Sequence, residues 1–248
     1  MLVAATTDCF PEKSLPAALE KLADLEYTSV EIAIHEQGQQ LRPSQVLREF
    51  DKAHTLCRQT RLTISSFSLD FNAAGEEYYQ QFTACCKLAK AMKVSTLTIP
   101  SVELGTPFNE EIERLRRLHA IATLEGILVG LKTQIGCLTE NPDTAVVLCD
   151  QVKGLGLTLD PSHYITGPLR GGKYRQVMKY VVNVHLRDST KDHFQVRVGQ
   201  GEIEYGRLIT ELAKENYRRA LVVHIVPMDD VDHAGEMRKM RLLLESLL

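Results

Sequence analysis

The segment "ILVGLK", residues 127–132, has the composition of a buried strand. Its first five residues carry no polar side chain, and Lys132 then ends the run with an ammonium group. Short continuous apolar runs are typical of strands that are covered on both faces, as in a parallel sheet. The segment therefore predicts a strand of such a sheet, with Lys132 at its carboxyl end.

Similar runs, rich in branched aliphatic residues, recur along the chain, and longer segments with helical periodicity separate them. In residues 76–92, for example, apolar side chains recur at helical spacings of three and four and so share one face. The expected strands are residues 2–7, 29–34, 62–67, 94–99, 127–132, 155–159, 181–186 and 220–226.

Strands that alternate with helices in this way fit either a closed barrel or an open doubly wound sheet. The first expected strand–helix turn carries no GxGxxG motif, which an open dinucleotide-binding sheet would have there. The number of strand–helix units also matches a closed barrel. We therefore predict a single domain over residues 1–248 with the (β/α)8 TIM-barrel fold.

The charge balance argues against two classes of partner. The chain has 29 basic and 32 acidic residues in mixed order, so it offers no case for binding nucleic acid or a membrane surface. No apolar run approaches the roughly 20 residues of a membrane span, and the first residues lack a secretory signal pattern.

The six cysteines show no CxxC pair. We expect a cytoplasmic protein with reduced cysteines, and we leave self-association into a homo-oligomer open.

Catalytic groups in TIM barrels lie at the carboxyl ends of the strands and in the loops that follow. Histidines and an aspartate follow three consecutive expected strands here, which predicts a functional site. The polar residues at the expected strand ends are Asp8, Glu31, His35, Ser66, Ser68, Asp70, Ser101, Glu103, Lys132, Gln134, Asp160, His163, His185, Arg187, Asp188 and His224.

Three segments carry a resemblance to a known family: "GLTLDPSHY" (156–164), "VNVHLRDS" (182–189) and "VGQGEIEYGRLI" (198–209). They resemble the sugar-phosphate isomerase/epimerase family, the xylose isomerase-like TIM barrels of the AP endonuclease family 2 superfamily. The resemblance covers nearly the whole chain. It implies a small sugar-like or polyol-like ligand at the carboxyl face of the barrel, and aldose–ketose isomerisation or epimerisation as the ancestral reaction.

The resemblance also implies a divalent metal held by a glutamate after strand five, an aspartate after strand six, a histidine after strand seven and a glutamate after strand eight. Asp160 and His185 match two of these positions, whereas Lys132 and His224 stand where the family has its glutamates. In the family those glutamates also move the substrate proton. Activity in this chain is therefore expected to be altered.

Four hypotheses remain open on the sequence. In the first, the barrel binds a sugar-like ligand and uses Lys132 or His224 as a catalytic base. In the second, Asp160, His185 and His224 hold zinc, manganese or iron. Alternatively, Lys132 forms a Schiff base with a carbonyl ligand. The fourth hypothesis is a non-catalytic relative that only binds a metabolite.

The charges at the site favour a direct replacement of the metal. A buried ammonium needs a carboxylate partner, so we expect Lys132 to pair with Asp160 and to stand where the metal would. We further expect four residues to contact the ligand: Glu31, His163, Arg187 and Asp188.

Overall fold

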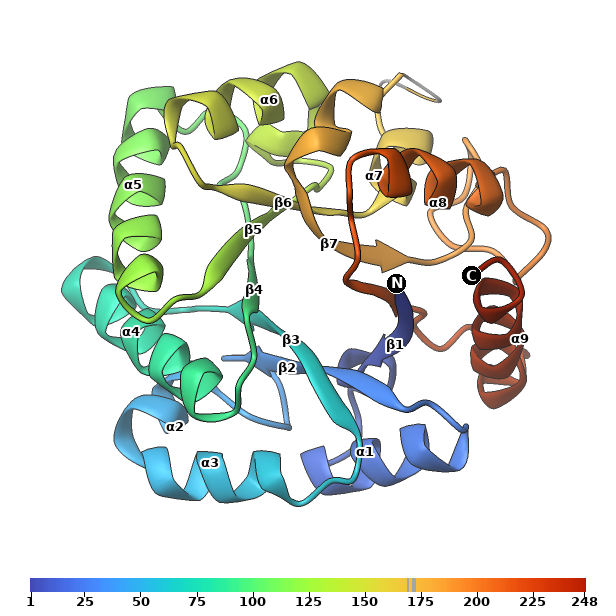
Figure 1. Cartoon of the computed structure of the whole chain (residues 1–248), viewed down its shortest axis with the longest axis horizontal. Helices are drawn as coiled ribbons and strands as arrows, with labels where there is room; N and C mark the ends of the chain where they lie inside the picture. Colours follow the sequence, from blue (N-terminus) through green and yellow to red (C-terminus); the bar gives the residue numbers. More distant parts are fainter. Residues whose placement is uncertain (169, 171–172) are drawn as a thin grey trace.

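The fold predicted from the sequence is confirmed. The computed structural model describes residues 1–168, 170 and 173–248. Eight parallel strands close into one barrel in sequence order, and the helices lie around it (Figure 1). The strands are β1 (Leu2–Thr6), β2 (Ser29–His35), β3 (Thr63–Asp70), β4 (Thr96–Ile99), β5 (Leu128–Lys132), β6 (Gly156–Leu159), β7 (Val181–Leu186) and β8 (Ala220–Val223).

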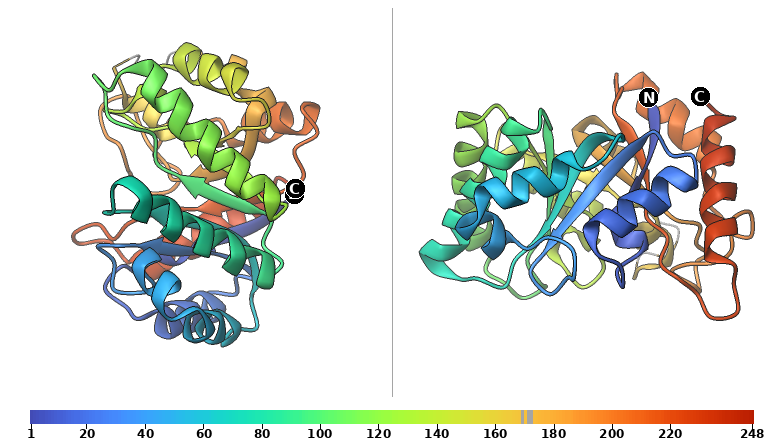
Figure 2. Two further views of the ribbon diagram at one scale, coloured as in Figure 1. Left: turned by 90° about the vertical axis from the view of Figure 1, so that its left-hand side faces the viewer. Right: turned by 90° about the horizontal axis from the view of Figure 1, so that it is seen from below.

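The helices lie outside the barrel in each view (Figure 2), so that the strands are covered on their outer face. They are α1 (Leu15–Asp24), α2 (Pro43–Arg48), α3 (Phe50–Arg58), α4 (Gly75–Ala91), α5 (Phe108–Leu124), α6 (Pro142–Gln151), α7 (Pro161–Thr166), α8 (Tyr205–Lys214) and α9 (His233–Glu245). The connection from β6 to β7 departs from the regular pattern, because its described residues form only the short α7 and a 3-10 helix, Arg175–Tyr180.

Local sequence features fix where several of these helices begin. At α6, Asn141 is the N-cap residue, and its side chain accepts a hydrogen bond from the backbone N–H of Asp143 at 2.8 Å. Pro142 occupies the first helical position, where its missing N–H costs nothing. Asp160 caps α7 in the same way and is therefore held at the carboxyl end of β6.

The barrel closes by pairing of β1 with β8, which brings the two ends of the chain side by side (Figure 1). Inward-facing side chains alternate along each strand, as the pleat requires. Near the amino ends of the strands, Ala4, Ala220 and Val222 form a small apolar cluster inside the barrel. Polar side chains follow toward the carboxyl ends, and this change positions the candidate site.

All six cysteines are free and buried, as the sequence predicts. Within the described residues, none of the helices combines the length and apolar character needed to cross a membrane.

Candidate functional site

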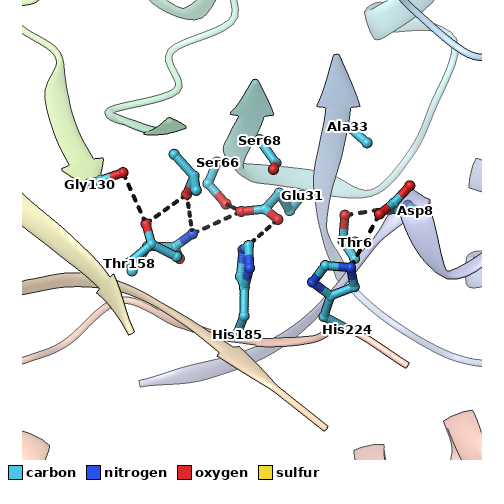
Figure 3. Close-up of polar contacts among 12 residues, drawn as sticks. Thr6, Asp8, Glu31, Ala33, Ser66, Ser68, Gly130, Thr158, His185 and His224 are labelled. Atoms are coloured by element: carbon cyan, nitrogen blue, oxygen red, sulfur yellow. Dashed lines mark hydrogen bonds and ion pairs between the residues drawn. The ribbon is translucent and has the colours of Figure 1, made fainter. Parts of the chain in front are cut away.

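A buried polar network centred on Glu31 fills the middle of the barrel. Ser66 Oγ and Asn183 Nδ2 donate hydrogen bonds to Glu31 Oε2 at 2.7 and 2.8 Å, and His185 Nε2 lies 2.8 Å from Oε1 (Figure 3). Burial raises the pKa of Glu31, but His185 and these hydrogen bonds outweigh this effect, and the resulting pKa is about 2. Glu31 is therefore an ionised carboxylate, and Ser66, Asn183 and His185 are its neighbours.

The network continues across the barrel. Asn183 Nδ2 also donates to Thr98 Oγ1 at 3.1 Å, and the hydroxyls of Thr98 and Thr158 lie 2.7 Å apart. Gly130 leaves room for this contact, because a Cβ at that position would collide with Thr158 Oγ1. The predicted ligand residue Glu31 and the predicted metal ligand His185 thus belong to a fully buried layer beneath the mouth of the barrel.

Arg187 is the central cation of the mouth. Its Nη2 donates hydrogen bonds to Asp160 Oδ2 at 3.0 Å and to His224 Nδ1 at 3.1 Å. The guanidinium carbon also lies 4.6 Å from the centroid of the Phe194 ring, which covers it. The side chain is 5% exposed, and its Nε is buried without a hydrogen-bond partner among the described residues.

This geometry corrects one expectation. The cation bound to Asp160 is Arg187 rather than Lys132, and within the described residues Lys132 forms no ion pair shorter than 4.0 Å. Burial raises the pKa of Asp160, but the neighbouring Arg187 and Lys132 charges hold it well below its usual range. Both hydrogen bonds come from Arg187 Nη2, whose two N–H groups reach Asp160 and His224 at once.

Lys132 nevertheless faces the same mouth. Burial lowers the pKa of its ammonium; the Asp160 charge opposes this shift and the Arg187 charge adds to it. The side chain is partly exposed rather than fully enclosed. Lys132 is therefore an accessible amine at the carboxyl end of β5 with an increased tendency to be neutral.

His224 has protein partners at both ring nitrogens. Nδ1 accepts the hydrogen bond from Arg187, so Nε2 carries the proton and donates it to Asp8 Oδ2 at 3.2 Å (Figure 3). Burial and the Arg187 charge lower the pKa of His224 to about 3, although the Asp8 hydrogen bond opposes them. The imidazole is thus neutral at physiological pH and links Arg187 to Asp8.

His35 extends this chain to the next strands. Its Nδ1 lies 3.8 Å from Asp8 Oδ1, and its Nε2 lies 3.4 Å from Ser68 Oγ. Asp8 and His35 line a small cavity of about 30 Å³. Polar contacts therefore run around the mouth from Asp160 through Arg187, His224, Asp8 and His35.

His163, a predicted ligand residue, lies at the same mouth. Its Nδ1 accepts a hydrogen bond from the Ile135 backbone N–H at 3.1 Å, and its Nε2 lies 3.7 Å from Asp160 Oδ2. Burial lowers its pKa to about 4 against the opposing charge of Asp160. His163 is therefore neutral at pH 7, with its proton on the nitrogen that faces Asp160.

Asp188, the fourth predicted ligand residue, is directed elsewhere. Its carboxylate accepts hydrogen bonds from the backbone N–H groups of Ser189, Gly199 and Gly201 at 3.2, 2.8 and 3.0 Å. A Cβ at position 201 would collide with this carboxylate, which explains the glycine there. Asp188 therefore holds the loop after β7 through these backbone hydrogen bonds, and its role as a ligand contact stays a prediction.

A family model described as the xylose isomerase-like TIM barrel matches residues 19–245. The chain belongs to this family. No curated protein matches it.

Several solved structures share the fold of this xylose isomerase-like barrel. A xylose isomerase-like TIM barrel protein from Mycobacterium smegmatis in complex with magnesium is 16% identical, with a TM-score of 0.79 over 99% of this chain and 96% of that chain. The 3-keto-D-glucoside 4-epimerase from E. coli is 12% identical, with a TM-score of 0.76 over 99% of both chains. The IOLI protein with a zinc atom is 15% identical, with a TM-score of 0.75 over 100% of this chain and 98% of that chain.

Two of these relatives contain a metal ion, but the residues of this xylose isomerase-like barrel do not fit one. In the described part of the chain, no three His, Cys, Asp or Glu side chains are grouped so as to hold a metal. Arg187 Nη2 lies between two of the three predicted ligands, Asp160 and His224, and His185 contacts Glu31 instead. A divalent cation there would also be repelled by the guanidinium and by Lys132.

The sequence prediction assigned no role to Asp8, His35 and Phe194. Asp8 and His35 both stood at expected strand ends. The position of His35 on the inner face follows from the two-residue period of β2, whereas Asp8 lies in a 3-10 helix, Thr7–Cys9, that follows β1. Phe194 lies in the loop after β7, where no periodicity indicates which way a side chain points.

Proposed function

We propose that this barrel binds a small sugar-like carbonyl compound at the carboxyl ends of its strands. We further propose that it isomerises or epimerises this compound without a resident metal ion, with Lys132 as the catalytic residue. One observation carries the proposal: Arg187 occupies the place between Asp160 and His224, and among the described residues Lys132 has no ion-pair partner within 4.0 Å.

Such a reaction needs a positive charge near the carbonyl oxygen, and Arg187 can supply it. When a proton leaves the carbon next to a carbonyl group, negative charge develops on the carbonyl oxygen and must be stabilised. A divalent ion does this in metal-dependent enzymes of this kind. Here Arg187 brings a cationic guanidinium to the end of β7, at the same mouth as Lys132 at the end of β5.

Lys132 can act on a carbonyl compound in two ways. Its amine can remove the neighbouring proton as a general base, or it can add to the carbonyl carbon as a nucleophile. Both ways need the neutral amine, and the lowered pKa of Lys132 increases the neutral fraction.

His224, the second residue predicted to be catalytic, is better suited to a positioning role. Proton transfer by His224 would break its hydrogen bond to Arg187 or to Asp8. Its neutral ring instead accepts from Arg187 and so fixes the guanidinium next to the ligand. His163 and Asp160 offer further polar groups for ligand hydroxyls at the same mouth.

The ligand class is supported by the relatives. One of them is a 3-keto-D-glucoside 4-epimerase, which acts on a sugar with a carbonyl group. A carbonyl sugar also matches the residues. Lys132 can act on its carbonyl group, and the neutral His163 and the acidic Asp160 can bind its hydroxyl groups.

The test is a panel of ketoses, aldoses and keto-glycosides incubated with the protein in the presence of a chelator, with products identified by NMR. We expect at least one compound to be converted, and we expect Lys132→Met to lower the rate by at least about 100-fold. The matched control is Lys153→Met, since that side chain is 84% exposed, and it should leave the rate unchanged.

Two results would contradict the proposal: turnover that a chelator abolishes, or turnover that survives in Lys132→Met. Thermal stabilisation by a sugar without any turnover would identify the non-catalytic binding protein instead.

A further inference from the structure

We propose that Phe194 is an aromatic gate over the cation at the mouth of the barrel. Its ring covers Arg187 and His163, and it turns away to let a ligand reach them, while the backbone of its loop stays in place. This inference rests on the ligand site of the proposed function and specifies how the ligand enters that site.

Arg187 has hydrogen-bond donors in reserve for a ligand. Both hydrogen bonds of its guanidinium come from Nη2, which donates to Asp160 Oδ2 and to His224 Nδ1. Among the described residues, Nε and Nη1 have no hydrogen-bond partner, and Nε is buried. A buried polar group without a partner is costly, so a donor of this kind in a side chain that is 5% exposed points to a ligand oxygen as its acceptor.

The Phe194 ring lies against two groups of the candidate site at once. Its centroid is 4.6 Å from the guanidinium carbon of Arg187 and 4.6 Å from the ring centroid of His163. Both of these side chains are buried, whereas Phe194 is partly exposed. A ring that touches both buried groups and itself reaches solvent forms part of their cover.

The mouth needs such an opening to admit a sugar. Asp8 and His35 line a cavity of about 30 Å³, which has room for about one water molecule. Sites for small molecules typically measure about 300–1,000 Å³. Asp160 and His224, the partners of Arg187, are buried as well. Because these side chains are so little exposed, a sugar-sized ligand can contact several of them only after a covering side chain has moved.

The backbone next to Phe194 is held by hydrogen bonds. The Gln195 side chain donates to Val226 O at 2.7 Å and accepts from the Val226 N–H at 2.9 Å. The Val196 N–H donates to Asp188 O at 2.9 Å. These contacts tie the loop after β7 to the segment after β8 and to its own base. The loop is therefore anchored on the side that follows Phe194.

The ring itself is held more weakly than the loop. Its aromatic contacts within the described residues are the cation–π contact with Arg187 and the tilted contact with His163. Phe194 also lies outside the hydrophobic core of the described chain, so its removal leaves the core intact. Exposed side chains change rotamer in picoseconds to nanoseconds, faster than loops rearrange. The moving part is thus the ring, which the anchored backbone keeps close to Arg187.

The first experiment measures access to Arg187 with phenylglyoxal, a dicarbonyl compound that modifies accessible arginines, and locates the adducts by peptide mass spectrometry. In the native chain we expect Arg187 to react far more slowly than Arg116, whose side chain is 50% exposed. Phe194→Ala should speed the modification of Arg187 about tenfold, the factor that corresponds to a contact of cation–π strength. The rate at Arg116 should stay the same.

The matched control is Phe50→Ala. It removes another partly exposed aromatic ring, which stacks on His54 in α3, and it should leave the rate at Arg187 unchanged. Equal rates at Arg187 in the native chain and in Phe194→Ala would overturn the gate, because the ring would then not cover the guanidinium.

The second experiment separates a gate from a purely structural role of the ring. Hydrogen exchange of the Val196 and Val226 N–H groups, followed by NMR, reports opening of the loop. We expect equal exchange rates in the native chain and in Phe194→Ala, because the ring does not hold the backbone. Faster exchange of both amides in Phe194→Ala would overturn the inference, since the ring would then fasten the loop.

Failure of the gate and failure of the proposed function are distinguishable. Neither phenylglyoxal modification nor hydrogen exchange measures turnover, so an overturned gate leaves the panel of carbonyl sugars as an independent test. A panel without turnover, in turn, leaves the access of reagent to Arg187 and its dependence on Phe194 unaffected.

Discussion

Arg187 Nη2 donates a 3.0 Å hydrogen bond to Asp160 Oδ2 and joins the carboxyl ends of β7 and β6. This pair neutralises the carboxylate that the family resemblance assigns to a metal ion. In the part of the chain that the structure describes, Lys132 on the neighbouring strand β5 has no ion-pair partner within 4.0 Å, and burial lowers its pKa. The unusual amine at the mouth of the barrel is thus a consequence of how the arginine is placed.

Removing the arginine should destabilise the fold. Arg187→Met leaves Asp160 as a buried charge without its main counter-charge, and breaking such a pair costs about 3–5 kcal/mol. Urea unfolding measures this loss. Arg116→Met is the matched control, because its ion pair with Glu113 is exposed and contributes about 1 kcal/mol or less. Equal losses in the two variants would show that the Asp160 pair is not significant for stability.

A double variant separates the lost charge from the lost packing. Adding Asp160→Asn to Arg187→Met removes the orphaned carboxylate, so we expect part of the lost stability to return. If the double variant is less stable than Arg187→Met, then Asp160 contributes chiefly through its capping hydrogen bond to the Ser162 N–H.

Metal binding should need two substitutions rather than one. Lys132→Glu restores a family carboxylate but leaves the guanidinium between Asp160 and His224. We expect Lys132→Glu combined with Arg187→Gln to bind Mn²⁺, and Lys132→Glu alone to bind it far more weakly. Calorimetric titration with Mn²⁺ checks the order. Near-stoichiometric metal in native protein purified without chelator would contradict the cation replacement.

The fold could be predicted because its determinants are local and repeated. Each strand is a short apolar run, each crossover has helical periodicity, and caps such as Asn141-Pro142 mark where helices begin. A barrel then fixes which strand ends meet. The same reasoning placed Lys132, Asp160, His163 and His224 at one mouth.

The partners within the site could not be predicted in this way. Lys132 ends β5 and Arg187 directly follows β7, and both strands pair with β6, so topology alone allowed either residue to bind Asp160. The choice depends on side-chain reach and on the second acceptor, His224 Nδ1, because Arg187 Nη2 donates to both acceptors from one position. One pattern was available: Asn183, His185 and Arg187 alternate and so share the inner face of the barrel.

The neutral histidines should make the protein sensitive to mild acid. The pKa of His224 is about 3 in the folded chain against an ordinary value of 6.5, so the unfolded state binds more protons between these values. Stability contributed by His224 is therefore present above pH 6.5 and is lost as the pH falls toward 3, with a slope of up to about 1.4 kcal/mol per pH unit.

Urea unfolding at several pH values checks this linkage. His224→Asn keeps an acceptor near Nδ1 but removes the titrating ring, so its stability should depend less steeply on pH below 6.5. His193→Asn, an exposed histidine, should retain the native slope. Parallel slopes for the native chain and His224→Asn would place the acid sensitivity in other groups, such as His163.

Two glycines allow a test of the packing beneath the site. A Cβ at Gly130 would collide with Thr158 Oγ1, whose hydroxyl is 2.7 Å from Thr98 Oγ1 in the Glu31 network. We expect Gly130→Ala to cost about 1–3 kcal/mol, since the barrel interior must shift. In Gly206→Ala the new Cβ has only Leu247 nearby at 3.8 Å and lies in α8, so we expect a gain of about 0.5–1 kcal/mol. Thermal unfolding of both variants distinguishes steric fit from helix propensity. A neutral Gly130→Ala would mean that Thr158 can rotate away, and that the contact between the two threonines does not fix the Glu31 network.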